Sequence, residues 1–249
     1  MHQFLLDFSK TSSQSDKIKQ HGYHRIHPWF IGHLKNVPVT LLEIGLKNND
    51  SIELWKQYFN DVEVYGIDID PKEYVSDAKL FKLDQSKQNE LENFATIVNC
   101  KFDIIVDDGS HVPAHQLKTI NTLWALLKPG GIYIIEDIET SYWGSAKCYN
   151  YRFNANIKKN NLIYQFVSCI KWINKEFAVK IVKSKEVVLS DEVLNETEII
   201  SFAYNSIVLI KKDPSFNQYY ERPYRYINKI NAYSFPNRIL KKIIKAIRN

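Results

Sequence analysis

The stretch 102–143, FDIIVDDGSHVPAHQLKTINTLWALLKPGGIYIIEDIETSYW, constrains the fold more than any other part of the chain. It contains two short apolar, β-rich runs at 102–106 and 132–135. Between them, 115–127 has helical spacing and stops at Lys-Pro-Gly-Gly. A right-handed crossover through such a helix makes the two strands parallel. The pattern predicts a strand–helix–strand unit of an open α/β sheet.

Polar residues follow both strands. The first ends in Asp-Asp-Gly-Ser-His at 107–111, and the second ends in Glu136 and Asp137. Ligands of open sheets bind at the carboxyl edge of parallel strands. Grouped carboxylates repel one another, so such a cluster usually holds a hard cation or keeps a proton. A single acid would be interpreted as a helix cap, but two acidic groups on neighbouring strands favour a functional site.

Composition limits the class of protein. The chain has 249 residues, of which 45% are hydrophobic and 13% aromatic, which fits one folded α/β domain with additions. Its three cysteines have no CxxC spacing, which argues against a disulfide framework or a zinc site. Apolar runs are too short for a secretory signal or a membrane span. We expect a cytoplasmic protein.

The net charge of +5 is concentrated in the tail FPNRILKKIIKAIRN. The remainder is near neutral, which argues against nucleic acid as a partner. Isoleucine and leucine in this tail form a stripe opposite the basic residues, so we predict an amphipathic helix. Three interpretations stay open: contact with an anionic membrane, contact with another subunit of a homo-oligomer, or docking on its own domain.

The same strand and helix pattern continues along the chain. Strands are predicted at 39–44, 62–67 and 80–83, helices at 51–59 and 161–177, and two strands around a turn near Asn205. These elements predict a Rossmann-like, doubly wound, mostly parallel sheet with a C-terminal antiparallel hairpin. We expect one domain over 1–249, divided into an N-terminal segment at 1–36, a core at 37–143 and 198–213, an insertion at 144–197 and a basic extension at 214–249.

A nucleoside cofactor is indicated by the first half. Glu43 and Gly45 form a tight turn after a strand, where a backbone approaches a ligand. Asp68, at the end of the next strand, suits the two hydroxyls of a ribose. The glycines of a dinucleotide loop are missing, which weighs against NAD or FAD and tolerates S-adenosylmethionine. Asp84 and Gln85 are placed to meet an adenine.

The motifs LLEIG, VYGIDID, KLDQS, FDIIVDDGSH and LKPGGIYIIEDIETSYW resemble those of class I S-adenosylmethionine-dependent methyltransferases. More closely, they resemble the metal-dependent, mycinamicin-type sugar O-methyltransferases of macrolide biosynthesis. They are also similar to the cephalosporin hydroxylase-like family. The resemblance covers 12–143 and extends weakly to 201–212. We expect the unmatched insertion at 144–197 to carry acceptor specificity.

The resemblance implies roles for single residues. Asp108, Glu136 and Asp137 would bind Mg²⁺, and His111 would be the general base. Tyr142 and Trp143 are expected to form an aromatic wall for a sugar ring.

Further roles that the resemblance implies concern the cofactor. Asp68 would hold the ribose, and Asp107 is expected on the cofactor side. The segment SDKIKQHGY would cover the cofactor through Lys17 and Tyr23. Glu43 and Gly45 would line the methionine end, and Asp84 with Gln85 would meet the adenine.

The chemistry fits these residue types. A divalent ion that chelates two vicinal hydroxyls lowers the pKa of one of them, and a neutral imidazole can accept its proton. We therefore expect an S-adenosylmethionine- and Mg²⁺-dependent O-methyltransferase. Composition and analogy favour a nucleotide sugar or glycan precursor of a bacterial surface polysaccharide as the acceptor. A secondary-metabolite glycoside and a non-catalytic assembly protein with this fold are the alternatives.

Overall fold

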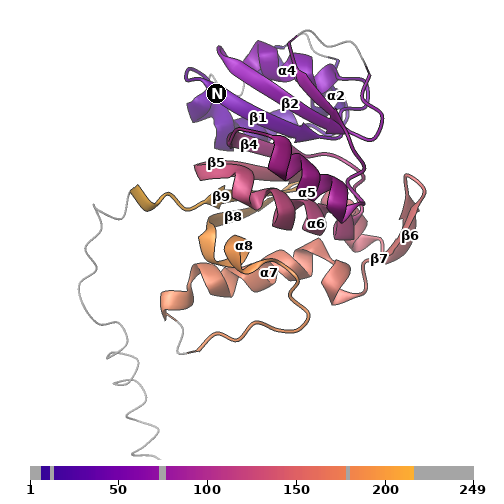
Figure 1. Cartoon of the computed structure of the whole chain (residues 1–249), viewed down its shortest axis with the longest axis vertical. Helices are drawn as coiled ribbons and strands as arrows, with labels where there is room; N and C mark the ends of the chain where they lie inside the picture. The colour runs from indigo at the N-terminus through magenta and orange to yellow at the C-terminus, as the bar shows by residue number, and fades with distance from the viewer. Residues whose placement is uncertain (1–6, 12–13, 73–76, 178–179, 216–249) are drawn as a thin grey trace, which may run out of the picture.

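The structure is a computed structural model that describes residues 7–11, 14–72, 77–177 and 180–215. A seven-stranded sheet in the order β3-β2-β1-β4-β5-β9-β8 forms its centre (Figure 1). The first five strands in chain order are parallel, whereas β9 runs antiparallel to β5 and β8 antiparallel to β9. This confirms the predicted fold class. The strands are β1 (Val39–Ile44), β2 (Val62–Asp68), β3 (Lys79–Lys82), β4 (Phe102–Asp107), β5 (Leu127–Glu136), β8 (Thr197–Ala203) and β9 (Ser206–Lys211).

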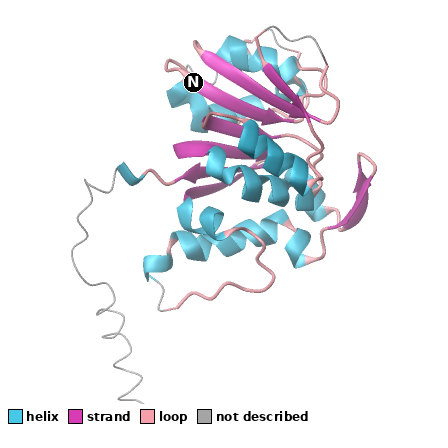
Figure 2. Cartoon of the chain, in the orientation of Figure 1, coloured by secondary structure: helices cyan, strands magenta, loops and turns pink. Residues whose placement is uncertain are grey.

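Helices cover both faces of the sheet (Figure 2). Because central strands are buried on both sides, their residues alternate between two cores: Leu42 packs with Phe94 and Phe166, and Leu41 packs with Trp55. One face carries α5 (Gln88–Ile97), α6 (Pro113–Leu123), α7 (Leu162–Ile173) and α8 (Asp191–Glu196), and the other carries α3 (His27–Ile31) and α4 (Asp50–Tyr58).

The boundary between helix and strand at 124–131 differs from the prediction. The α-helix ends at Leu123 and continues as the short 3-10 helix η3 (Trp124–Leu126). Strand β5 then begins at Leu127, before the Lys-Pro-Gly-Gly segment. Its pairing with β4 skips residues there, because Phe102 faces Leu127 whereas Ile104 faces Ile132. The segment therefore loops out of the ladder, as a Pro without an N–H donor and a left-handed Gly allow.

The region 144–197 contains elements that the sequence patterns did not predict. The antiparallel pair β6 (Ser145–Cys148) and β7 (Tyr151–Asn154) projects from the body of the molecule (Figure 1). The predicted helix at 161–177 is observed as α7 followed by η6 (Lys175–Phe177). The amphipathic tail predicted from 235 onward lies outside the described residues. No helix within the described ranges has the length and apolar character that a membrane crossing needs.

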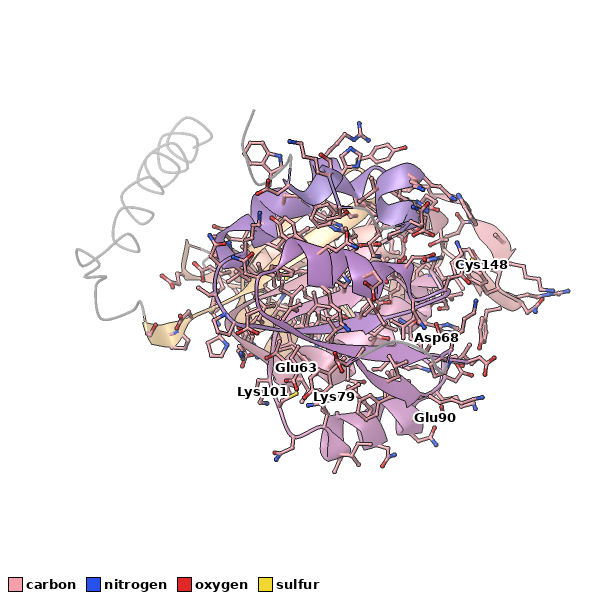
Figure 3. All side chains as sticks on the ribbon, turned by 90° about the horizontal axis from the view of Figure 1, so that it is seen from above. Glu63, Asp68, Lys79, Glu90, Lys101 and Cys148 are labelled. Carbon is pink, nitrogen blue, oxygen red and sulfur yellow. The ribbon has the colours of Figure 1, made fainter. Side chains whose placement is uncertain are left out.

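The strand registers bring four carboxyl ends to one edge of the sheet. Ile44 faces both Ile67 of β2 and Asp107 of β4, and Asp107 in turn faces Ile135 of β5. Figure 3 shows Asp68 at this edge, on the side of the molecule that also carries Cys148 of the β6–β7 hairpin. The acidic residues after these strands are therefore neighbours, as the sequence predicts.

Gly45 is required for this close approach. Its φ is +86°, and a Cβ atom added there would lie 2.1 Å from the backbone oxygen of Asp108. The turn after β1 therefore packs directly against the turn after β4, which no side chain at 45 would permit. In this structure the glycine makes room for the neighbouring backbone, and its predicted contact with a cofactor stays a prediction.

Candidate functional site

The carboxyl edge of the sheet carries Glu43, Asp108, Glu136 and Asp137, and we call it the acidic edge. A buried lysine lies among these carboxylates. Lys17 belongs to the short helix α2 (Asp16–Lys19), and its side chain is 1% exposed. Its Nζ atom lies 2.6 Å from Asp108 Oδ2, 2.6 Å from Glu136 Oε2 and 3.1 Å from Glu43 Oε1. The residue predicted to cover the cofactor thus binds two of the three carboxylates that were predicted to bind Mg²⁺.

The electrostatics of this group depend on burial and charge pairing. Burial by itself would lower the pKa of Lys17, but the attraction of Asp108, Glu136 and Glu43 outweighs it and holds that pKa well above its ordinary value. Burial raises the pKa values of Glu136 and Glu43, against the attraction of the lysine. The lysine is therefore charged, and it compensates carboxylates that have little access to water.

The rest of the N-terminal segment also contacts the end of β5. Tyr23 donates a hydrogen bond from its hydroxyl to Asp137 Oδ1 at 2.6 Å and accepts one from the Asp137 backbone N–H at 3.0 Å. His21 Nδ1 lies 3.2 Å from Asp137 Oδ1, and His27 Nε2 lies 3.4 Å from Glu136 Oε1. The three rings are stacked in the order His21, Tyr23, His27. Burial lowers the pKa of His27 well below its ordinary value, so its ring is neutral.

Among the residues that the structure describes, Asp108, His111 and Asp137 form a group that could hold a metal ion, because each offers a ligand atom within 4.8 Å of the others. His111 Nε2 lies 3.5 Å from Asp137 Oδ2. His111 and Asp137 both have left-handed backbones, with φ of 55° and 52°. Such backbones cost about 1–3 kcal/mol each and persist where the surroundings impose them, often at functional sites.

The donor set of this group fits Mg²⁺ in chemical type. Asp108 and Asp137 supply the carboxylate oxygens that a hard cation prefers. Glu136 binds Lys17 through Oε2, and its Oε1 atom lies 3.4 Å from His27 Nε2. Its predicted role as a ligand stays a prediction, as do those of Asp108 and Asp137.

Asp68 and Glu43, the predicted ribose and methionine contacts, lie at the same edge, and both accept hydrogen bonds from other groups of the chain. Asp68 accepts hydrogen bonds from the backbone N–H groups of Leu46 and Asp70, at 2.7 Å and 2.8 Å. Glu43 is fully buried and accepts from Ser51 Oγ and Trp55 Nε1. Both carboxylates shape the turn after β1.

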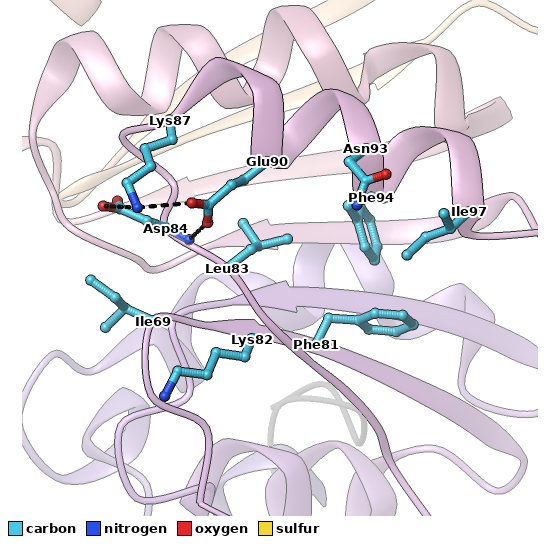
Figure 4. Close-up of a pocket in the computed structure, with 10 residues that line it drawn as sticks. All are labelled: Ile69, Phe81, Lys82, Leu83, Asp84, Lys87, Glu90, Asn93, Phe94 and Ile97. Atoms are coloured by element: carbon cyan, nitrogen blue, oxygen red, sulfur yellow. Dashed lines mark hydrogen bonds and ion pairs between the residues drawn. The ribbon is translucent and has the colours of Figure 1, made fainter.

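Asp84 and Gln85, predicted to meet the adenine, and Asp107, predicted on the cofactor side, differ in their surroundings. Asp84 lines a cavity of about 500 Å³ between the end of β3 and helix α5 (Figure 4). Gln85 is buried and joins the strand ends, donating to Asp107 Oδ1 at 2.7 Å and accepting from the Ser110 N–H at 2.9 Å. Burial raises the pKa of Asp107 to about 7. Apart from Asp84, the cavity is lined by Ile69, Phe81, Lys82, Leu83, Lys87, Glu90, Asn93, Phe94 and Ile97.

The β6–β7 hairpin places an unpredicted aromatic ring beside His111. Tyr149, at the tip, has its ring centroid 5.6 Å from that of His111, and its side chain is 64% exposed. Tyr151 anchors the hairpin, because its hydroxyl lies 3.2 Å from Asp84 Oδ1 and its ring meets that of His115 edge-on. The hairpin therefore forms one wall beside the acidic edge.

The residues of the predicted sugar wall, Tyr142 and Trp143, lie just before the β6–β7 hairpin in the chain. Tyr142 ends the 3-10 helix η4 (Ile138–Tyr142), which follows Asp137 directly. Tyr142 and Trp143 are 71% and 50% exposed, and Tyr142 lines a second hollow of about 400 Å³ with Asn156, Lys158 and Tyr164.

Of the two features that were missed, the hairpin and the contacts of Lys17, only the hairpin has a signal in the sequence. Alternation across Ser-Ala-Lys-Cys-Tyr-Asn-Tyr-Arg-Phe-Asn around a Tyr-Asn pair is a hairpin pattern, and Tyr149 and Asn150 both have positive φ, as a tight two-residue turn requires. Lys17 lies in a segment that also carries His21, Tyr23 and His27, and these three side chains face Asp137 or Glu136 at the end of β5. No local pattern gives those partners, because Lys17 and Glu136 are 119 residues apart.

No family model matches the chain. The chain is similar to the 8-demethyl-8-alpha-L-rhamnosyl tetracenomycin-C 2′-O-methyltransferase of Streptomyces olivaceus, with 36% identity over 138 residues, covering 52% of this chain and 36% of that protein. It is also similar to the mycinamicin VI 2″-O-methyltransferase of Micromonospora griseorubida, with 34% identity over 149 residues, covering 55% and 37%. The chain thus matches little more than a third of the length of these curated relatives.

Among solved structures, the chain is similar to the MycE methyltransferase of the mycinamycin biosynthetic pathway in complex with Mg, SAH and mycinamycin VI. The TM-score is 0.68 at 24% identity, with 83% of this chain and 55% of that one covered. This similarity shows that the chain has the α/β methyltransferase fold. In sequence, the chain is related to macrolide-sugar O-methyltransferases.

Proposed function

We propose that this chain, a relative of the macrolide-sugar O-methyltransferases, transfers the methyl group of S-adenosylmethionine to a hydroxyl of a sugar with the help of Mg²⁺. The observation that supports this most is the convergence of Asp108, His111 and Asp137 at the carboxyl edge of the sheet. Two hard oxygen donors and one imidazole are the groups that activation of a sugar hydroxyl needs.

The acceptor that we propose is a sugar of a glycoside. One relative is named for a rhamnosyl tetracenomycin, and the MycE structure contains mycinamycin VI. Neither name points to a surface polysaccharide, so the preference drawn from composition finds no support in these comparisons. The glycoside alternative now becomes the main proposal.

In this proposal, separate residues would bind the metal ion and accept the proton. Asp108 and Asp137 would hold Mg²⁺, which when bound polarises the acceptor hydroxyl. His111 Nε2, which faces Asp137, would accept the proton of that hydroxyl, and the Asp137 carboxylate would stabilise the imidazolium that results. The hydroxyl oxygen forms the new bond to the methyl carbon as the carbon–sulfur bond breaks. The wall of the β6–β7 hairpin would limit how a sugar ring approaches.

The experiment that tests this function is a transfer assay with methyl-labelled S-adenosylmethionine. Purified protein with Mg²⁺ is incubated with rhamnosyl glycosides in one set and with nucleotide sugars in another. We expect label in a glycoside product. Label in nucleotide sugars alone would contradict the proposed acceptor. If the protein binds S-adenosylmethionine but labels none of these compounds, the non-catalytic alternative is favoured.

Replacing Asp68 tests the cofactor part of the proposal. Asp68→Ala should weaken S-adenosylmethionine binding by about 1.5–3 kcal/mol, which is the scale of lost hydrogen bonds to a charged group. Calorimetric titration gives the dissociation constant. Asp70→Ala is the matched control, because Asp70 is exposed and pairs with Lys82. An unchanged dissociation constant for Asp68→Ala would exclude Asp68 as the ribose ligand.

Replacing Tyr149 tests the acceptor wall. Tyr149→Asn removes the ring but suits the left-handed turn, so it should raise the acceptor KM about threefold to tenfold and leave kcat nearly unchanged, as expected for loss of an aromatic contact. Steady-state kinetics with the acceptor found above measure this effect. Tyr142→Ala and Trp143→Ala serve as rival variants: a larger rise in KM for either one would favour the wall predicted from the sequence.

A further inference from the structure

The acidic edge already contains a cation that belongs to the chain. The ammonium group of Lys17 lies within 3.1 Å of Glu43, Asp108 and Glu136, and a lysine has one N–H donor for each of these carboxylates. We propose that Lys17 is the resident cation of this centre and that a divalent metal ion binds when the ammonium leaves Asp108. This inference rests on the metal-binding part of the proposed function.

Asp108 is the residue over which the two cations compete. It binds Lys17 through Oδ2 at 2.6 Å, and it also belongs to the group Asp108, His111 and Asp137 that could hold a metal ion. Mg²⁺ demands near-ideal geometry at about 2.0–2.1 Å from its ligands. A lysine that still binds Asp108 would place a second positive charge close to the ion, in a region where burial leaves little water to screen their repulsion.

Lys17 is suited to such an exchange by its chemistry. It carries a single charge on a flexible stem, so it can withdraw without a change in the sheet. In the absence of metal it compensates carboxylates that would otherwise repel one another in a buried position. The same ammonium therefore stabilises the metal-free state and lowers the affinity for a divalent ion.

The exchange should loosen one defined part of the N-terminal segment. Helix α2 has only four residues, and its contacts include the Ser15 cap and the ion pair between Asp16 and Lys47 at the surface. The contacts of Tyr23 and His27 with the end of β5 do not involve Lys17. Departure of the ammonium from Asp108 should therefore raise the mobility of 16–20 and leave the stacked rings in place.

Calorimetric titration of Mg²⁺ into metal-free protein tests the competition. Lys17→Met removes the charge and keeps the length of the side chain, and it should bind Mg²⁺ about tenfold more tightly than the unmodified protein, because a nearby repulsive charge is gone. Lys19→Met is the matched control on the same helix: Lys19 is exposed, so its affinity should change less than about twofold. Equal or weaker binding by folded Lys17→Met overturns the inference.

Hydrogen exchange in the unmodified protein gives a second test that does not depend on the folding of a variant. Saturating Mg²⁺ should speed exchange at the amides of Ile18 and Gln20, which bond to Ser15 and Asp16, and leave α6 unchanged. Unchanged or slower exchange at these amides overturns the inference. If neither protein binds Mg²⁺, the metal centre itself fails and the inference fails with it. Methyl transfer is measured separately and reports on the proposed function.

Discussion

Replacing His111 by alanine should lower kcat by about 10²–10⁴-fold, the usual contribution of a general base. His111 is the imidazole of the candidate group, and its Nε2 atom lies 3.5 Å from Asp137 Oδ2. S-adenosylmethionine affinity should stay nearly unchanged, because the ring lies beside Tyr149, on the side proposed for the acceptor. The measurement is kcat at saturating Mg²⁺, cofactor and acceptor.

Two further variants separate chemistry from folding. His111→Asn also removes the base, but it suits the left-handed backbone at this position and should be as inactive as His111→Ala. His33→Ala is the matched control, because His33 is exposed on the N-terminal side of the sheet. A decrease in kcat of less than about threefold for both variants at 111 would be well below the usual contribution of a general base. His111 would then be a structural residue, and another group would take the proton.

The parallel sheet and its acidic edge could be predicted because their causes are local. Apolar runs such as 102–106 are short, β-rich and followed at once by acids or by Gly, so strand identity and strand direction both follow from neighbouring residues. The right-handed crossover rule then places the ends of β4 and β5 together. The registers of Asp107 with Ile44 and Ile135 confirm this placement.

What the sequence did not predict depends on contacts between distant segments. Lys17 reaches Asp108 across 91 residues from a four-residue helix, whose pattern specifies no partner. The predicted contact of Gln85 with an adenine stays a prediction, but its hydrogen bond to Asp107, which links the segment after β3 to β4, did not follow from the sequence. The position of Tyr149 beside His111 could be predicted only if the short β6–β7 hairpin was recognised, and that hairpin lies in a region without a matching motif. In each case tertiary packing, rather than periodicity, selects the contact.

Removing divalent metal should reduce turnover by about a hundredfold or more, because polarisation of the acceptor hydroxyl is worth several kcal/mol. We expect EDTA to stop methyl transfer and Mg²⁺ to restore it. Protein freed of metal, with its metal content verified, is assayed over a series of Mg²⁺ concentrations. Full activity in metal-free protein would exclude a catalytic role for the ion, whatever binds at Asp108.

Variants of the carboxylates then locate the ion. Asp137→Asn keeps the shape of the side chain and removes a charged oxygen donor, so it should raise the Mg²⁺ concentration needed for half of the maximal rate by about tenfold or more. Asp191→Asn is the matched control, because Asp191 is exposed on α8 and pairs with Lys183.

Glu136→Gln tests whether Glu136 is also a ligand of the ion. If Glu136 is a ligand, Glu136→Gln should raise the Mg²⁺ concentration needed for half of the maximal rate, as Asp137→Asn does. If Glu136 mainly holds Lys17 and His27, the variant should lose thermal stability with little change in Mg²⁺ dependence, because a buried lysine would lose one of its three partners.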